Sequence, residues 1–168
     1  PKGVVVNRLD SAAVVRDLCA IRDDEVDCVV AFVHWGNEYE RKPNRDQRKM
    51  AELMKSNGVD IIIGSHPHVA QPYEVDEEGK IVVYSLGNFV SNQRKRYTDG
   101  GLMVVVDVEE NVEGELKYYI NCIPVWVKLP KYQIITPAVG DTMKMDVVSS
   151  EAYRIFMDDT RKLLDKGV

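Results

Sequence analysis

The sequence contains few cysteines, few histidines and no long apolar run. Its three cysteines, Cys19, Cys28 and Cys122, form no CxxC pair and show no zinc-finger spacing. We therefore expect them to be small buried hydrophobic residues, and they do not decide the redox compartment. No apolar run approaches the roughly 20 residues that span a bilayer, and no charged-then-apolar leader is present. The sequence thus predicts no membrane segment within this chain.

Charge and length limit the class of protein further. The net charge of -5 argues against nucleic acid as a partner, because binding to a phosphate backbone requires an excess of Lys and Arg. With 168 residues, of which 45% are apolar and 29% charged, the chain has the composition of a soluble globular protein. A single domain spanning residues 1–168 is the simplest organisation.

The first half of the chain alternates between strand and helix patterns. Val4–Val6 is a short β-branched run, and Asp10 or Ser11 could cap the helix that follows it. The run Val26–Val33 is almost continuously apolar, which predicts a strand buried on both faces. A helix ending at Asn57 and a strand at 59–63 follow. Strand, helix and strand form a βαβ unit with parallel neighbours and a right-handed crossover.

The second half has a different pattern. A β-hairpin is expected at 73–84. Antiparallel strands are expected at 102–108, 115–127 and 133–136, and a final helix from Ser149 onward. The segment 92–101 is polar and basic and is expected to be mobile. The predicted fold class is therefore α/β, with a βαβ first half, then mainly antiparallel strands and a C-terminal helix.

All three histidines of the chain follow apolar strands. His34 ends one strand, and His66 and His68 follow the next, on either side of Pro67. The ends of strands in open α/β sheets are where ligands bind, and neutral imidazole is a common metal ligand. Solvent-exposed histidines without a role are the alternative. Since the parallel strands bring His34 near the other two, we favour a metal-binding or catalytic role.

Other residues near these histidines are weaker candidates. Glu38 and Asn88 could bind substrate or metal, because a hydrolytic dinuclear site also needs carboxylates or amides. The alternatives are a surface position for Glu38 and a turn for Asn88. Trp35 and Tyr39 could line a substrate groove or pack in the core.

A short basic run, Arg94-Lys95-Arg96, follows the last of these candidates. Arg94 and Arg96 could attract a polyanion or a phosphate. The alternative is a solvated loop.

Three motifs carry a resemblance to a known family. They are Val33-His34-Trp35-Gly36-Asn37-Glu38-Tyr39, Gly64-Ser65-His66-Pro67-His68-Val69-Ala70-Gln71-Pro72 and Val83-Tyr84-Ser85-Leu86-Gly87-Asn88-Phe89. In this order they resemble the bacterial capsule-synthesis (CapA, poly-γ-glutamate) family. That family is similar in fold to the calcineurin-like metallophosphoesterases, whose Gly-His-x-His signature matches the position of the second motif. The resemblance covers about 4–136.

The resemblance implies a fold, a site and a location. The fold would be part of a metallophosphatase-like α/β/β/α sandwich. His34 and His66 would approach one divalent transition metal ion and His68 a second, with Mn, Fe or Zn as candidates. The partners would be an anionic polymer or a phosphoester substrate and other capsule-synthesis proteins. The location would be the bacterial cell surface, through a membrane-associated segment elsewhere in the protein.

The resemblance also implies that part of the site lies elsewhere. Two earlier motifs of the family, Gly-Asp and Gly-Asn-Asn-His, have no counterpart in this sequence. We therefore expect this chain to be the C-terminal half of a larger domain, to bind metal poorly alone, to be inactive alone and to self-associate. Two functions stay open: a capsule-polymer protein, or a hydrolase that uses a dinuclear metal centre on phosphoesters.

Overall fold

The structure is a computed structural model that describes Gly3, residues 9–22 and residues 26–165. The strand predicted at 4–6 lies outside the described residues. Among the described helices, none has the length and apolar character needed to cross a membrane.

The two N-terminal helices begin at side chains that accept hydrogen bonds from free backbone amides. Asp10 Oδ1 accepts from the amide of Ala13, 2.9 Å away, at the start of α1 (Ser11–Arg22). The helix α2 (Arg45–Ser56) begins with a capping box between Asn44 and Gln47 and ends at Asn57. Both predicted helices are confirmed, whereas the capping box was not anticipated.

The first sheet has four strands in the order β1-β2-β4-β3. Its members are β1 (Val30–His34), β2 (Ile61–Ser65), β3 (Tyr73–Val75) and β4 (Ile81–Val83). β1 pairs in parallel with β2, and β2 pairs in parallel with β4, whereas β3 and β4 are antiparallel. The βαβ unit and the predicted hairpin are thereby confirmed.

The prediction that the first strand is buried on both faces is wrong. The strand starts at Val30, and the Phe32 side chain is 79% exposed. Ala31 and Val33 pack toward the helices. The opposite face of β1 stays open because β1 is the edge strand and the second sheet packs over Ile61 and the inner strands instead.

The burial expected for cysteine is also wrong at one position. Cys19 is exposed on α1, whereas Cys28 and Cys122 are partly buried. Val14 and Leu18 take the core-facing positions of this helix, which leaves Cys19 on another face.

The second sheet is antiparallel, in the order β5-β6-β7. It consists of β5 (Gly100–Glu110), β6 (Leu116–Lys128) and β7 (Gln133–Ile135), as the strand patterns predicted. A short helix α3 (Pro137–Gly140) and the long helix α4 (Val147–Leu164) follow. α3 was not anticipated.

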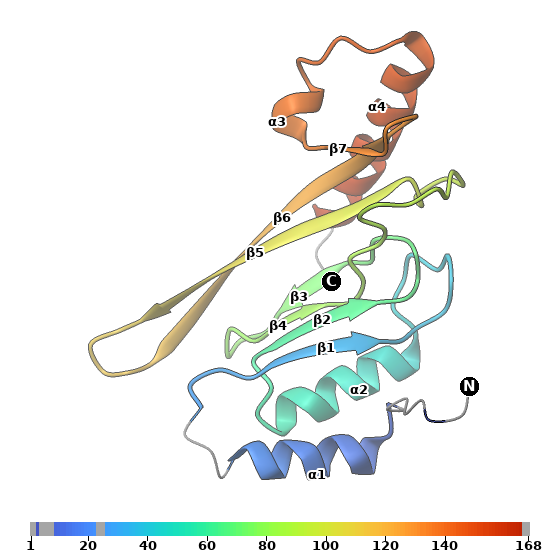
Figure 1. Cartoon of the computed structure of the whole chain (residues 1–168). Helices are drawn as coiled ribbons and strands as arrows, with labels where there is room; N and C mark the ends of the chain where they lie inside the picture. Colours follow the sequence, from blue (N-terminus) through green and yellow to red (C-terminus); the bar gives the residue numbers. More distant parts are fainter. Residues whose placement is uncertain (1–2, 4–8, 23–25, 166–168) are drawn as a thin grey trace.

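Three apolar clusters join these elements into layers (Figure 1). The first lies between the N-terminal helices and the four-stranded sheet, around Ile62 and Met54. The second joins that sheet to β5 and β6, around Ile81 and Val83. The third lies between the second sheet and α4, around Trp126 and Phe156. The α/β class is confirmed, and the likeness to a metallophosphatase sandwich stays a prediction.

Candidate histidine site at the sheet rim

The parallel pairing of β1 and β2 brings the three histidines together. His34 is the last residue of β1 and lies opposite Ser65, the last residue of β2, so that His66 and His68 follow at the same edge. The ring centroids of His34 and His66 are 4.6 Å apart, and those of His66 and His68 are 6.3 Å apart. This is the juxtaposition that the βαβ pattern predicted.

Hydrogen bonds orient the His34 ring. Ser65 Oγ donates to the carbonyl of Val33 at 3.1 Å and lies 3.3 Å from His34 Nδ1. A hydroxyl has one proton, so Ser65 Oγ accepts from His34 Nδ1–H. In neutral His34 the lone pair is therefore on Nε2, where it can bind a metal ion or take up a proton.

The His68 ring is oriented in the same way by Asn88. The Asn88 side-chain nitrogen donates to the carbonyl of Thr98 at 2.8 Å and to Gln93 Oε1 at 3.3 Å. Its Oδ1 must then accept from His68 Nδ1, which is 3.0 Å away. Neutral His68 also has its lone pair on Nε2. Asn88 thus positions an imidazole and, through Thr98, holds the basic loop, defined here as residues 91–99.

The backbone is strained around these histidines. His66 and His68 have φ of 104° and 59°, and Tyr39 and Tyr97 have φ of 67° and 74°. These are four of the five described non-glycine residues with positive φ. Such conformations cost about 1–3 kcal/mol each and persist where the surrounding contacts hold them, which is typical of functional sites. One of these contacts is the hydrogen bond from the amide of Tyr39 to the carbonyl of Pro67, at 2.7 Å.

Close packing supports the rim from below. A Cβ on Gly64 would collide with the carbonyl of Tyr84 and the indole of Trp35. Trp35 is 6% exposed and donates from Nε1 to that carbonyl at 2.8 Å. The contacts of Trp35 are those of a core residue, which was the alternative to the substrate groove.

A buried glutamine positions the loop before α2, and sequence reasoning missed it. The fully buried Gln71 donates to the carbonyl of Glu40 at 2.8 Å and accepts from Gln47 Nε2 at 2.7 Å. The only sequence signal was the presence of Gln71 in the second motif.

The remaining predicted substrate residues are Glu38, Arg94 and Arg96, and each has different surroundings. Glu38 is exposed and makes no hydrogen bond or ion pair within the described residues. Arg94 donates to the backbone carbonyls of Ser91 and Gln93, each at 3.2 Å. Arg96 binds both carboxylate oxygens of Asp159 on α4, at 3.0 and 3.1 Å. Both arginines therefore hold the basic loop in place.

A second contact anchors the loop that was expected to be mobile. The Arg41 guanidinium lies 4.2 Å from the centroid of the Tyr97 ring and donates to the carbonyl of Asp159 at 3.1 Å. Its Nε is buried with no hydrogen-bond partner, and burial lowers the pKa of this guanidinium. Arg41 thus fastens the basic loop to α4.

The described residues fit only part of a metal site. Three imidazoles are suitable ligands for Mn, Fe or Zn. However, across residues 9–22 and 26–165 no group of three or more His, Cys, Asp and Glu side chains is placed to hold a metal ion. A dinuclear centre needs carboxylates or amides that balance the charge and bridge the ions. The site geometry defines an α/β protein with an imidazole-lined rim beside a basic loop.

Comparison with known proteins gives the family. Residues 2–93, more than half of the chain, match the family described as bacterial capsule synthesis protein PGA_cap. The chain belongs to this family, as the three motifs predicted.

Two curated relatives agree with this assignment. The chain is 36% identical over 125 residues to "PGA biosynthesis protein CapA" of Bacillus subtilis (strain 168), covering 74% of this chain and 31% of that protein. It is 44% identical over 136 residues to "Capsule biosynthesis protein CapA" of Bacillus anthracis, covering 81% of this chain and 30% of that protein. The chain thus spans less than a third of the length of either relative.

Proposed function

We propose that this chain takes part in the biosynthesis, export or anchoring of a bacterial capsule polymer, poly-γ-glutamate or a related polyanion. Membership of the family and the names of both relatives support this role. The structural observation that carries it is a rim of three histidines beside a basic loop that the protein holds in place. The cell surface is the expected location, with other capsule-synthesis proteins as partners.

The histidine rim suits a polyanion for an electrostatic reason. His34 and His68 keep Nδ1 in hydrogen bonds to the protein, so that only Nε2 is available to a ligand. Where no metal ion occupies these nitrogens, each protonated Nε2–H donates a charge-assisted hydrogen bond to a carboxylate. The overall charge of -5 would repel such a polymer from the rest of the surface. The basic loop beside the histidines would then be the favoured place for the polymer to bind.

We propose further that His34, His66 and His68 are the imidazole share of a metal site. The remaining carboxylate or amide ligands would come from residues other than those described. With them in place, bound Mn, Fe or Zn would supply Lewis-acid chemistry. The chain's own contribution is to orient the imidazoles through Ser65 and Asn88. The alternative function is a metal-dependent phosphoesterase. It is favoured by the Nε2 lone pairs of His34 and His68, because neutral imidazole nitrogens of this kind can bind metal ions.

Binding and turnover separate the two functions. Anisotropy with a fluorescent γ-glutamate oligomer should show saturable binding, and a His66→Ala/His68→Ala double variant should weaken it by about tenfold through the loss of two of the three rim imidazoles. The control is the exposed Cys19→Ser variant, which leaves the rim intact. Absence of polymer binding, together with Mn-dependent hydrolysis of an aryl phosphate, would replace the capsule role with the phosphoesterase.

Metal analysis tests the imidazole share of the metal site. A longer protein that contains this chain, purified without chelator, should retain about two transition-metal ions per chain, as expected for a dinuclear site. The double histidine variant should retain none. Unchanged metal content in that variant would exclude these histidines as ligands.

A further inference from the structure

Lys95 occupies a different position from the two arginines that flank it. Arg94 donates to backbone carbonyls of its own loop, and Arg96 binds the carboxylate of Asp159. Lys95 is exposed and has no ion pair among the described residues. Its Nζ lies 4.7 Å from the centroid of the Tyr39 ring. Neither Lys95 nor Arg94 has an ion pair among the described residues, but Arg94 donates to the backbone of its own loop, whereas Lys95 reaches the Tyr39 ring.

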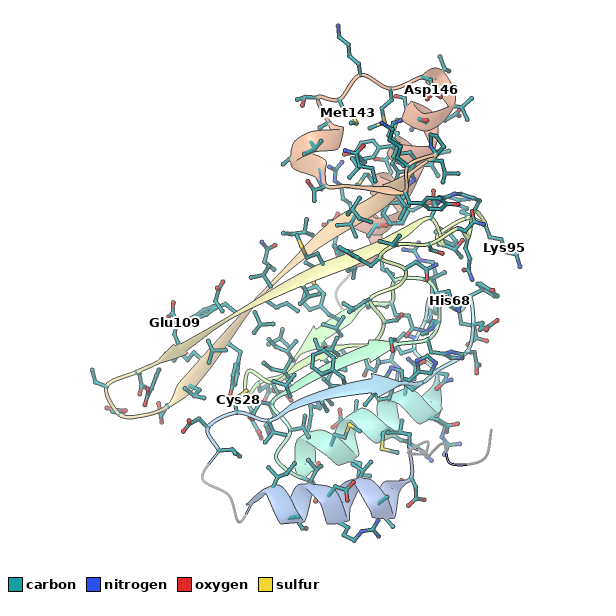
Figure 2. All side chains as sticks on the ribbon, viewed as in Figure 1. Cys28, His68, Lys95, Glu109, Met143 and Asp146 are labelled. Carbon is teal, nitrogen blue, oxygen red and sulfur yellow. The ribbon has the colours of Figure 1, made fainter. Side chains whose placement is uncertain are left out.

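Tyr39 connects this cation to the histidine rim. The Tyr39 and His68 rings stack with centroids 6.0 Å apart and an interplanar angle of 25°. We call Lys95, Tyr39 and His68 the cation stack. Figure 2 shows Lys95 and His68 on the same side of the molecule. An ammonium over a tyrosine ring is attracted by the negative face of the ring, which favours this arrangement.

The cation stack is held from both ends. The backbone of Tyr39, with its positive φ, is held by the hydrogen bond from its amide to the carbonyl of Pro67. The loop that carries Lys95 is fixed by the pair between Arg96 and Asp159. Tyr39 remains 41% exposed, so a ligand can reach the stack. A site fixed before binding loses less conformational entropy when the ligand arrives.

A neighbouring hollow is a weaker anion site. It has a volume of about 420 Å³ and lies between the basic loop and α4. Its walls include the three cations of the basic run, Lys95 among them, and the carboxylates of Asp99 and Asp159, which already accept hydrogen bonds from Trp126 and Arg96. These two carboxylates offset two of the three positive charges, which makes the hollow a weaker site for a polyanion. On the other side of the loop, Lys95 contacts the Tyr39 ring and forms no ion pair with a described carboxylate.

We propose that Lys95 and Tyr39 form a carboxylate-binding subsite that positions one unit of an acidic polymer beside His68. This inference rests on the proposed function and names the recognition element within it. The ammonium binds the carboxylate, and the Tyr39 ring packs against the methylene groups of the same unit. A γ-linked glutamate chain presents both groups in every unit. Lys95, and not Arg94 or Arg96, is then the specificity-determining cation of the loop.

Three Lys and Tyr variants test the subsite in the oligomer-binding assay. Lys95→Met keeps the length of the side chain but removes its charge, and should weaken binding by about fivefold. Lys95→Arg keeps the charge and should bind within about twofold of the parent. Tyr39→Leu should weaken binding as much as Lys95→Met, whereas Tyr39→Phe keeps the ring and should bind nearly normally.

The matched control is Lys117→Met, which removes one exposed lysine charge far from the site. Lys117 pairs in register with Glu109, which Figure 2 places at the opposite end of the molecule from His68. Equal affinity of Lys95→Met and Lys117→Met, with the parent binding normally, would overturn the subsite and leave the proposed function standing. Absence of polymer binding by the parent would instead refute both.

Circular dichroism and thermal melts show whether each variant keeps its fold. A variant that fails to fold is replaced by acetylation of the lysines on the folded parent, with the modified positions identified by mass spectrometry. Acetylation of Lys95 that lowers affinity supports the subsite, and acetylation of Lys95 that leaves affinity unchanged overturns it.

Discussion

The turn at Gly79 and the rim loop at His66 both require a positive φ, but they use different residues for it. In the hairpin turn between β3 and β4 the residue is glycine, with φ of 82°. At the rim, His66 and His68 take φ of 104° and 59°. Glycine adopts these angles without steric cost, whereas a residue with a Cβ does not.

The surroundings of the two regions explain the difference. A Cβ on Gly79 would meet nothing within 4 Å, and Asp76 closes the turn by accepting from the amides of Glu78 and Lys80. At the rim, the ring of the strained His68 is hydrogen-bonded to Asn88, and the ring of the strained His66 lies 4.6 Å from that of His34. The hairpin turn is thus built for stability. The rim keeps its strained conformation through surrounding contacts, such as the hydrogen bond from the amide of Tyr39 to the carbonyl of Pro67.

The largest expected effect comes from crowding the rim. Gly64→Ala would force Cβ into the carbonyl of Tyr84 and the indole of Trp35, and should destabilise the fold by about 3 kcal/mol in urea unfolding. The control is Gly114→Ala, where only the far end of Glu110 is near, and which should cost about 1 kcal/mol through its positive φ. Equal losses would contradict the tight packing under the histidines.

Substitutions at the two positive-φ positions, His66 and Gly79, test whether the backbone of His66 is strained. His66→Gly should stabilise the fold by about 1 kcal/mol, because relief of the strained φ exceeds the extra entropy of glycine in the unfolded chain. The same variant should weaken polymer binding. Gly79→Ala should do the reverse, losing about 1 kcal/mol and leaving binding unchanged. A His66→Gly variant that is less stable than the parent would show that His66 is not strained.

The smallest effect concerns pH at the hairpin turn. Burial raises the pKa of Asp76, but hydrogen bonds from Lys55 and from the amide of Lys80 outweigh it, so the net pKa is lowered. The pair is mostly buried, with side chains 12% exposed for Lys55 and 29% for Asp76. A lowered pKa gives stability that is present above the ordinary value of 3.8 and is lost as pH falls through the folded value.

Asp76→Asn should therefore lower the free energy of unfolding at pH 7 by about 0.5–1 kcal/mol, and the difference from the parent should shrink toward zero near pH 2. Urea unfolding at both pH values measures this. Glu78→Gln is the control, since that carboxylate is 74% exposed and should matter little at either pH. A constant difference across pH would mean that the charge of Asp76 is not responsible.

Much of the fold could be predicted because its signals are local. The apolar run at 59–63 and the helix ending at Asn57 specify a βαβ unit, and that unit places His34 beside His66. The same local reasoning failed for Phe32. A continuous apolar run indicates burial of both faces only where another layer covers each face, and the position of the second sheet is not a local property.

By itself, the sequence determined the family, the strands and the rim where the three histidines lie, because periodicity and motif spacing act over short stretches of chain. Only the tertiary structure decided which cation of the basic loop approaches the rim. That choice depends on Arg96 meeting Asp159 and on Lys95 meeting Tyr39, contacts between residues far apart in the sequence. Such contacts depend on how distant segments pack against each other, and the sequence of a three-residue basic run does not reveal this packing.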